Sequence, residues 1–292
     1  MTKTETNPFF VSLRKAAADA AKEHDARLIA LSGKFDGDSE GQVAAVESLI
    51  ARRVQGILIT PSNATAALDA IKEARQQGIL VIALDTPTQP EDAVDATYAT
   101  DNYEAGRLQG AYLRARLADR PPKVFMLDGT PGSSVSQDRH NGFLKGFGIR
   151  NDSPEISGRA DTNGDRNQAQ AATENLLEHT SDANTVYTLN EPVAEGVYAA
   201  FAARGRAQHV IIGSIDGGCP GVRDVKAGKY AATVMQFPDR MADLGVTAVT
   251  ESVKTGRKPS GFTATGAVLI TDKPVHGVSS QNTTWGLEHC WE

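Results

Sequence analysis

The sequence lacks the features that mark a membrane, nucleic-acid-binding or metal-binding protein. Its longest apolar runs, such as Ile79–Leu84, are far shorter than the ~20 residues that a membrane-spanning helix needs. Basic and acidic residues number 30 and 36, and the chain has no basic tract, so nucleic acid is not an expected partner. The two cysteines, Cys219 and Cys290, have neither CxxC spacing nor a nearby histidine cluster, so no metal site is predicted.

Signatures of nucleotide binding and acyl transfer are also missing. No G-x-G-x-x-G follows an expected strand, and neither a P-loop nor a G-x-S-x-G elbow is present. We therefore expect no cofactor and no catalytic residue. A carboxylate pair for glycoside hydrolysis stays an open alternative, because the separation of two side chains in space is not visible in a sequence.

The first residues, MTKTETNPFF, contain neither the basic stretch nor the apolar segment of an export signal. Two alternatives follow from the residues alone. The protein is either cytoplasmic, or it is exported by a signal that lies outside this chain.

The length of 292 residues exceeds most single hydrophobic cores and suits two α/β lobes. Short apolar strands alternate with amphipathic helices along most of the chain, which predicts parallel, doubly wound sheets. Segments such as Ile79–Leu84 are apolar on both faces, as strands covered by helices on both sides are. Roughly eight or nine strands are too many for one compact sheet of this kind, so two sheets are expected.

The expected strands are Arg27–Leu31, Gly56–Thr60, Ile79–Leu84, Lys123–Leu127, Glu155–Ala160, Thr185–Leu189, Val210–Ile215 and Ala231–Gln236. The expected helices are Pro8–His24, Gly41–Arg53, Ala64–Gln77, Tyr103–Ala118, Gln137–Gly146, Arg166–His179, Val193–Arg204 and Pro238–Thr255. Asn7 is a suitable N-cap for the first helix, with Pro8 at its first position. Gly78 and Gly205 follow helices, where a left-handed residue is favoured.

Polar side chains stand at the ends of several expected strands. In doubly wound sheets, ligands bind in the crevice outside the carboxyl ends of the strands. The residues that follow or end these strands are Asp85, Asn190, Asp216 and Gln236. Carboxylate and amide groups suit sugar hydroxyls, which both donate and accept hydrogen bonds. Phe9 and Phe10 can supply an aromatic surface for the C–H face of a sugar.

Each of these residues also has an ordinary structural interpretation. Asp and Asn after a strand commonly form turns or helix caps, and the two phenylalanines suit a buried core. Arg139 on a helix would usually be a solvated charge, and the neighbouring His140 has no evident partner. Polar strand ends in both halves of the chain nevertheless favour a binding site. Asp85 and Asp216 would lie in opposite lobes, which fits clamping of a ligand better than hydrolysis.

Seven motifs, in order along the chain, resemble those of one protein family. They are TNPFF (6–10), VIALD (81–85), ATDN (99–102), QDRHNGF (137–143), TLNE (188–191), IIGSIDG (211–217) and VMQFPD (234–239). From Thr6 to about Asp272 the chain is similar to periplasmic sugar-binding proteins of the ribose-binding type, which serve ABC transporters. The ending HGVSSQNTTWGLEHCWE and the stretch DGGCPG are most similar to fructose-binding members. LacI-type repressors share this family, but their helix-turn-helix is absent from the sequence.

The resemblance implies an α/β fold of two doubly wound parallel-sheet lobes joined by a three-strand hinge, the type I periplasmic binding protein architecture. One lobe would comprise residues 1–102 and 237–265, and the other residues 103–236 and 266–292. The implied sugar contacts are Asn7, Phe9, Phe10, Asp85, Arg139, Asn190, Asp216 and Gln236. The implied hinge residues are Asp101, Asn102, Phe237 and Gly266.

The implied function is capture of a monosaccharide by closure of the two lobes and its delivery to the membrane permease of an ABC transporter. The protein would be a periplasmic monomer without enzymatic activity, and its ligand is expected to be fructose. Ribose, or another pentose or hexose, is the alternative ligand. A sugar-sensing regulatory or chemotaxis domain is the alternative role.

Three departures from the family pattern bear on these expectations. Thr86 stands where ribose-binding members have an arginine, and Gly164 stands where they have an aromatic residue. Both changes widen the pocket or remove a stacking surface, which favours fructose over ribose. Family members also begin with an apolar strand before TNPFF, of which only Met1–Thr6 is present, so we expect a less stable first sheet.

The implied periplasmic setting also bears on the two cysteines. In an oxidising compartment we expect Cys219 and Cys290 to form a disulfide within the second lobe. Closing a loop of roughly 70 residues would contribute about 4 kcal/mol on the chain-entropy model.

Overall fold

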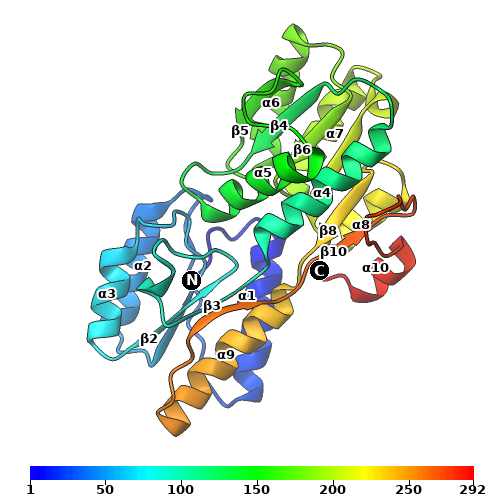
Figure 1. The fold of residues 1–292 in the computed structure, drawn as a ribbon. Helices are drawn as coiled ribbons and strands as arrows, with labels where there is room; N and C mark the ends of the chain where they lie inside the picture. The colour runs from blue at the N-terminus through cyan, green and yellow to red at the C-terminus, as the bar shows by residue number, and fades with distance from the viewer. The chain divides into compact units, whose positions relative to one another are not determined.

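The computed structural model describes all 292 residues, and the chain divides into two compact units (Figure 1). The first unit consists of Met1–Thr100, Pro131–Val135 and Phe237–Gly266. The second consists of Asp101–Thr130, Ser136–Gln236 and Ala267–Glu292. Each unit contains one largely parallel sheet, so the expected fold of two α/β lobes is confirmed. None of the helices combines the length and hydrophobicity that crossing a bilayer requires.

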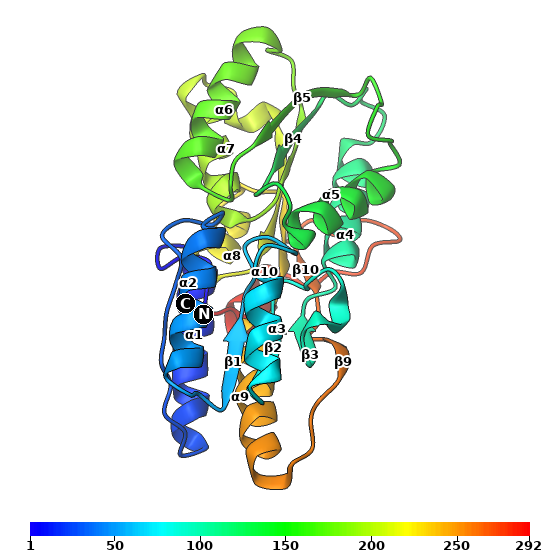
Figure 2. The ribbon, with the colours of Figure 1, turned by 90° about the vertical axis from the view of Figure 1, so that its left-hand side faces the viewer.

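The first unit is built on a four-stranded, all-parallel sheet in the order β1-β2-β3-β9. Its strands are β1 (Gly56–Ile59), β2 (Leu80–Leu84), β3 (Ala96–Ala99) and β9 (Gly261–Ala264). Its helices are α1 (Pro8–Glu23), α2 (Ser39–Ala51), α3 (Leu68–Gln76) and α9 (Pro238–Thr255), with a 3₁₀ turn at Glu91–Ala93. Helix α1 packs beside α9, and α2 packs beside α3 (Figure 2).

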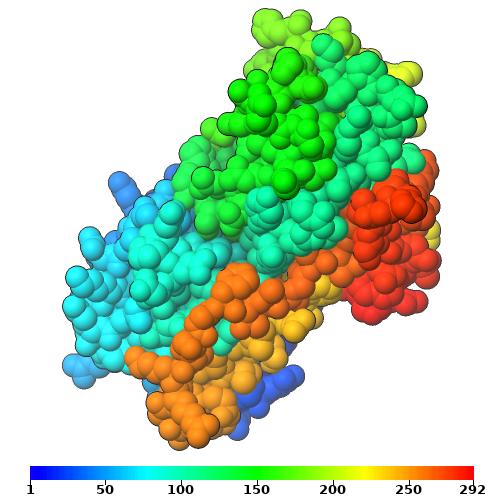
Figure 3. Space-filling model, in the orientation of Figure 1, coloured from blue at the N-terminus to red at the C-terminus, as the bar shows by residue number.

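Alternate side chains of β2 face opposite helix layers. Val81 packs in the cluster that includes α2 and α3, whereas Leu84 approaches α9 at Gly245. All five residues of β2 are buried, as its uninterrupted apolar sequence predicts. The edge strand β9 is exposed along its whole length and lies on the surface in the orange part of Figure 3.

The second unit is built on a six-stranded sheet in the order β10-β8-β7-β6-β4-β5, in which only the β10–β8 pair is antiparallel. Its strands are β4 (Val124–Asp128), β5 (Ile156–Asp161), β6 (Thr185–Thr188), β7 (Ile211–Asp216), β8 (Ala232–Met235) and β10 (Val268–Ile270). Its helices are α4 (Asn102–Leu117), α5 (Ser134–Phe147), α6 (Arg166–His179), α7 (Glu191–Ala203), α8 (Cys219–Lys226) and α10 (Thr283–His289), with a 3₁₀ turn at Ala207–His209. Helices α4 and α5 cover one face of the sheet, and α6 and α7 cover the other (Figure 1).

Capping side chains account for the helix boundaries. Asn7 accepts a hydrogen bond from the amide of Phe9 at 3.0 Å and caps α1, as predicted. Helix α2 begins two residues before the predicted start, because Asp38 caps it. Helix α3 begins at Leu68 instead of Ala64, since Asn63 holds the preceding residues in a side-chain-bonded turn.

Five elements were not predicted from the sequence. Strand β3 ends at the ATDN motif, where small and polar residues indicated a lobe boundary, and the exposed β9 lies in a stretch rich in glycine and proline. The others are β10, α8 and α10, which have three to eight residues each and too few to show a clear period.

The prediction of a strand at Arg27–Leu31 is wrong. The segment borders only an isolated bridge between Thr2 and Ser32. The amide of Thr2 donates to the carbonyl of Leu31 on that side. A strand needs a neighbour to pair with, and on this edge the neighbour consists of Met1 and Thr2 alone.

Met1 and Thr2 lie between two backbone edges and leave a groove beside them. The Met1 amino group donates to the carbonyl of Leu58 at 2.8 Å, so these residues continue the sheet beyond β1. The groove has a volume of about 830 Å³, and its walls include Ala26–Ile29, Gln55–Leu58 and Val249 of α9. Burial lowers the pKa of the Met1 amino group to about 5, so part of the cost of this arrangement is the lost charge of that amine.

An extension of five β-branched apolar residues placed before Met1 should raise the melting temperature by at least about 3 °C. Such an extension can pair with both groove edges, and it replaces the buried amine with an amide. Scanning calorimetry of the extended and unextended proteins measures the effect. An extension of five alternating glycine and serine residues is the control. It also replaces the buried amine with an amide but buries no apolar side chain, so it should raise the melting temperature by less. Equal transitions for both extensions would contradict the explanation.

His140 ties helix α5 to the end of β4. Its Nδ1 lies 2.8 Å from Oδ1 of Asp128, and its Nε2 lies 3.1 Å from Oδ1 of Asn151. The partner that the sequence did not reveal is therefore a carboxylate at a strand end. The hydrogen bond to Asp128 raises the pKa of His140, while burial and the nearby Arg159 act in the opposite direction.

Replacing Asp128 with asparagine should lower the free energy of unfolding by about 1 kcal/mol more near pH 5.5 than near pH 8.5. The pKa of His140 is raised in the folded protein above its ordinary value of 6.5. The stabilisation is thus fully present below that ordinary value and is lost as the pH rises through the folded value. Urea unfolding at the two pH values measures the difference, and an equal loss at both would count against the pair.

Candidate functional site

Asp85 follows β2 directly and has a left-handed backbone conformation. Its φ is 64°, which is uncommon for a residue other than glycine and costs of order 1 kcal/mol. Its amide donates to the carbonyl of Tyr98 at 3.0 Å, and Thr86 Oγ1 donates to its Oδ2 at 2.7 Å. The end of the sheet thus holds a buried carboxylate in a costly conformation, as residues of a binding site often are.

Lys3 is a buried lysine that faces Asp85. Its Nζ lies 4.0 Å from Asp85 Oδ2, and the two side chains are only 5% and 4% exposed. The same Nζ lies 5.6 Å from the centroid of the Phe10 ring, a distance typical of a cation–π contact. Because a buried charge requires a partner, Lys3 and Asp85 stabilise each other.

Asn7, Phe9 and Phe10 lie at the start of α1 in the same unit. Asn7 Oδ1 serves as the cap of the helix. Phe9 and Phe10 are each 3% exposed, and their rings meet edge to face with centroids 5.4 Å apart. Both rings are therefore packed among other atoms in this structure, and their contact with a sugar stays a prediction.

Arg139 is the centre of a polar network in the second unit. Its Nε donates to Asn102 Oδ1 at 2.8 Å, and its two terminal nitrogens donate to the carbonyl of Leu189 at 2.9 Å and to Gln236 Oε1 at 3.1 Å. Asp216 Oδ1 lies 3.9 Å from the guanidinium. Arg139 is 3% exposed, so the interpretation as a solvated surface charge is wrong.

Close packing of α4 against α5 places Asn102 beside Arg139. A Cβ atom added to Gly106 of α4 would clash with the carbonyl oxygen of Arg139. One added to Gly142 of α5 would clash with the carbonyl oxygen of Tyr103. The two helix backbones approach each other only because these positions carry no side chain.

Asp216 and Gln236 stand at the ends of two neighbouring parallel strands, β7 and β8. Gln236 Nε2 donates to Asp216 Oδ1 at 2.8 Å, and the two side chains are 1% and 3% exposed. The carboxyl ends of adjacent parallel strands meet at one edge of a sheet, which explains why residues twenty positions apart in the chain touch.

Asn190 follows β6, next to the Leu189 carbonyl that Arg139 contacts. Its Oδ1 accepts from the amide of Val193 at 3.0 Å and caps α7, and its Nδ2 donates to the carbonyl of Gly164 at 3.4 Å. The network thus joins Arg139, Asp216 and Gln236 directly, whereas the Asn190 side chain is engaged in capping. The structure also gives Gly164 a role as a hydrogen-bond acceptor.

Lys3 and Glu191 were missed by the sequence interpretation, and Asn102 was expected as a hinge residue and not as a partner of Arg139. Glu191 accepts from the amide of Gly217 at 3.0 Å and from Thr233 Oγ1 at 2.9 Å. Burial, followed by the proximity of Asp216, raises the pKa of Glu191 well above its ordinary value. The sequence offered only a weak indication of these contacts. Asn102 and Glu191 are the last residues of the ATDN and TLNE motifs, and Lys3 lies before the TNPFF motif.

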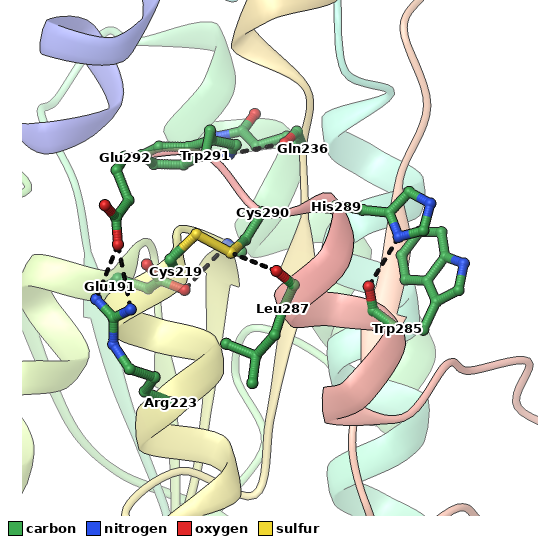
Figure 4. The surroundings of a disulfide bond; sticks show 11 residues. Glu191, Cys219, Arg223, Gln236, Trp285, Leu287, His289, Cys290, Trp291 and Glu292 are labelled. Atoms are coloured by element: carbon green, nitrogen blue, oxygen red, sulfur yellow. Dashed lines mark hydrogen bonds and ion pairs between the residues drawn. A yellow bond between two sulfur atoms is a disulfide. The ribbon is translucent and has the colours of Figure 1, made fainter.

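Cys219 and Cys290 are joined by a disulfide, with Cα atoms 5.0 Å apart (Figure 4). The bond links the first residue of α8, three positions after Asp216, to the residue that follows α10. It therefore attaches the C-terminal tail to the loop that leaves β7.

Both clusters combine a cation, a carboxylate and hydroxyl or amide groups, which suit the recognition of hydroxyl groups by charge-assisted hydrogen bonds. Asp85 and Asp216 belong to different units. The second carboxyl group near Asp216, that of Glu191, accepts hydrogen bonds from the Gly217 amide and the Thr233 hydroxyl. No group of three or more His, Cys, Asp or Glu side chains is placed to hold a metal ion.

Comparison with known sequences agrees with the fold. Residues 1–258 match the periplasmic binding protein domain. The chain is 32% identical over 251 residues to the ribose import binding protein of Haemophilus influenzae, covering 86% of this chain and 83% of that protein. It is 29% identical over 270 residues to the ribose import binding protein of Bacillus subtilis, covering 92% and 85%.

Solved structures show the same architecture. The ABC transporter periplasmic solute-binding protein of Actinobacillus succinogenes with bound D-allose has a TM-score of 0.83 at 26% identity, covering 92% of this chain and 95% of that chain. The ABC transporter solute-binding protein of Agrobacterium vitis with bound D-fucose has a TM-score of 0.85 at 26% identity, covering 94% and 95%. This chain therefore belongs to the periplasmic binding protein family, and its resemblance to the ribose-binding type is confirmed.

Proposed function

We propose that this protein is the solute-binding component of a carbohydrate ABC transporter and that it binds a monosaccharide with polar groups from both units. The buried network around Arg139 carries the proposal, since it gathers a cation, a carboxylate and two amides at the ends of parallel strands. Sugar hydroxyls can donate to Asp216 and accept from Arg139 at the same time. Relatives that are named as sugar-binding transport proteins and align along most of the chain support this role.

An aldose of the ribose or allose kind is the better-supported ligand. Curated relatives include ribose import binding proteins, and the D-allose-binding periplasmic protein of Escherichia coli is 24% identical over 280 residues. The expectation of fructose rested on the ending HGVSSQNTTWGLEHCWE and the stretch DGGCPG, and on the departures at Thr86 and Gly164. In the structure both residues hold binding-site side chains, since Thr86 donates to Asp85 and Gly164 accepts from Asn190. Fructose stays the second candidate, because threonine and glycine leave more room than the arginine and aromatic residue they replace.

The proposed mechanism is closure of the two units on the sugar about a hinge. The chain passes from one unit to the other at Thr100–Asp101, Gln236–Phe237 and Gly266–Ala267, and it also enters and leaves the first unit at the short segment Pro131–Val135. The predicted hinge residues flank the first three of these points. Gly266 has a φ of 110°, and a Cβ at that position would lie 3.3 Å from the Phe237 ring, so this position favours glycine. Contacts made only in the closed state would drive closure and reject sugars that leave a buried group unpaired.

The remaining parts of the proposal follow from this role. The closed form would be recognised by a membrane permease, the protein would act as a periplasmic monomer, and the sugar would leave chemically unchanged. A cytoplasmic sensor of the same fold would bind sugar equally well, and a response to the partner permease distinguishes the two.

Asp85→Ala and Arg139→Lys should each weaken sugar binding at least about 100-fold, because each leaves buried hydrogen-bonding groups unpaired. Isothermal titration with D-ribose measures the affinity, and thermal unfolding verifies that the variants fold. Arg150→Ala is the matched control, since that arginine side chain is 83% exposed, and it should bind as the unaltered protein does. Unchanged affinity in Asp85→Ala or Arg139→Lys would remove these residues from the site.

A thermal-shift panel of D-ribose, D-allose, D-fructose and D-glucose should separate the two candidate ligands. We expect ribose or allose to raise the melting temperature by several degrees, because a ligand present at about 100 times its dissociation constant adds about 2.7 kcal/mol to stability. If fructose alone raises the melting temperature, fructose and not an aldose is the ligand. No shift with any monosaccharide would contradict sugar binding.

A further inference from the structure

The C-terminal tail, residues 290–292 after α10, is hydrogen-bonded to Gln236 at the end of β8. Trp291 Nε1 donates to the backbone carbonyl of Gln236 at 2.9 Å, and the Trp291 carbonyl accepts from the amide of Cys219 at 3.0 Å. In Figure 4 the indole lies beside Gln236, and a dashed line marks the hydrogen bond between them. A Cβ added to Gly218 would come within 3.2 Å of the indole ring, so the ring also packs on the turn after Asp216.

The same tail is held covalently one residue away. Cys290 precedes Trp291 and is bonded to Cys219, which begins α8 (Figure 4). Beyond the disulfide, Glu292 makes only an exposed ion pair with Arg223, whose side chain is 56% exposed. The disulfide and the buried indole, at 9% exposure, therefore hold the tail in place, since an exposed ion pair contributes little.

The tail is connected to the binding network through Gln236 and through the turn after Asp216. Gln236, whose carbonyl Trp291 holds, donates through Nε2 to Asp216 and accepts through Oε1 from Arg139. The turn that follows Asp216 is held from the other side by Glu191, which accepts from the amide of Gly217. The Trp291 indole thus contacts Gln236 at its backbone carbonyl, and it contacts the turn after Asp216 at Gly218.

We propose that Trp291, kept in place by the Cys219–Cys290 disulfide, is a positioning residue that orients Gln236 and Asp216 for sugar binding. The inference rests on the proposed function and adds a redox dependence to it. A dithiol reductant supplies two electrons and two protons, so that Cys219 and Cys290 become thiols while the dithiol closes to a cyclic disulfide. The released tail no longer holds Gln236, and sugar affinity falls while the protein stays folded.

Trp291→Phe removes the indole N–H but keeps an aromatic ring, and it should weaken D-ribose binding about 10-fold. Trp285→Phe is the matched control, because Trp285 belongs to the same tail but stacks on His289 and should not affect affinity. Titration calorimetry of the full-length variants measures both. Equal affinity of Trp291→Phe and the unaltered protein would overturn the proposal.

A double-mutant cycle separates positioning through Gln236 from a general loss of stability. In a Gln236→Ala background, Trp291→Phe should have little further effect on affinity, because the side chain that it orients is gone. A full additional 10-fold loss in that background would show that Trp291 does not act through Gln236 and would overturn the inference.

Hydrogen–deuterium exchange of the sugar-free protein tests the positioning without any ligand. Trp291→Phe, the Cys219→Ser/Cys290→Ser double variant and the dithiol-treated protein should all exchange faster at Gly217–Cys219 and Gln236, and the dithiol should have no effect on the serine variant. Unchanged exchange in Trp291→Phe would overturn the inference whatever sugar is bound. If exchange rises as expected but no sugar binds the unaltered protein, the positioning is supported and the proposed function fails.

Discussion

The burial of the Arg139 guanidinium is the constraint on which the second half of the candidate site depends. A buried guanidinium is tolerated only when its donors are satisfied, and here they reach Asn102, the Leu189 carbonyl and Gln236, with Asp216 close by. These partners come from four separate stretches of sequence. The need to pair every donor of one guanidinium thus brings the strand ends together. It also explains why Gly106 and Gly142 must let α4 and α5 approach closely. A sugar that enters such a network exchanges existing hydrogen bonds for its own, which favours selectivity between sugars over raw affinity.

In the first unit the buried group that needs partners is an anion, the Asp85 carboxylate. Lys3 and the Thr86 hydroxyl supply them. Each unit therefore holds a carboxylate at a strand end with a cation beside it. Arg139 comes from helix α5 in the second unit, whereas Lys3 comes from the N-terminal segment before α1 in the first. The arrangement fits a protein that presents prepared polar groups to a ligand.

The fold could be predicted largely from the sequence, because most strands are continuous apolar runs that end at a polar residue. Asp85, Asn190, Asp216 and Gln236 were placed at strand ends on this ground, and the structure has each within two residues of one. The segment Arg27–Leu31 has strand composition too, but composition cannot supply the neighbour it lacks. Lys3 and Trp291 were not predicted for a related reason. Lys3 contacts Asp85 and Trp291 contacts Gln236, and both partners are far away in the sequence. The choice of sugar was likewise beyond reach, since Thr86 and Gly164 suggested a roomier pocket while the structure shows both engaged with site residues.

The central claim is that the Asp85 carboxylate and the Arg139 guanidinium hold the same sugar. A crystal structure of the protein grown with D-ribose tests it most directly. The account predicts one sugar molecule with hydroxyl groups within hydrogen-bonding distance of both side chains. A sugar bound elsewhere, or one that contacts only one of the two, would contradict it.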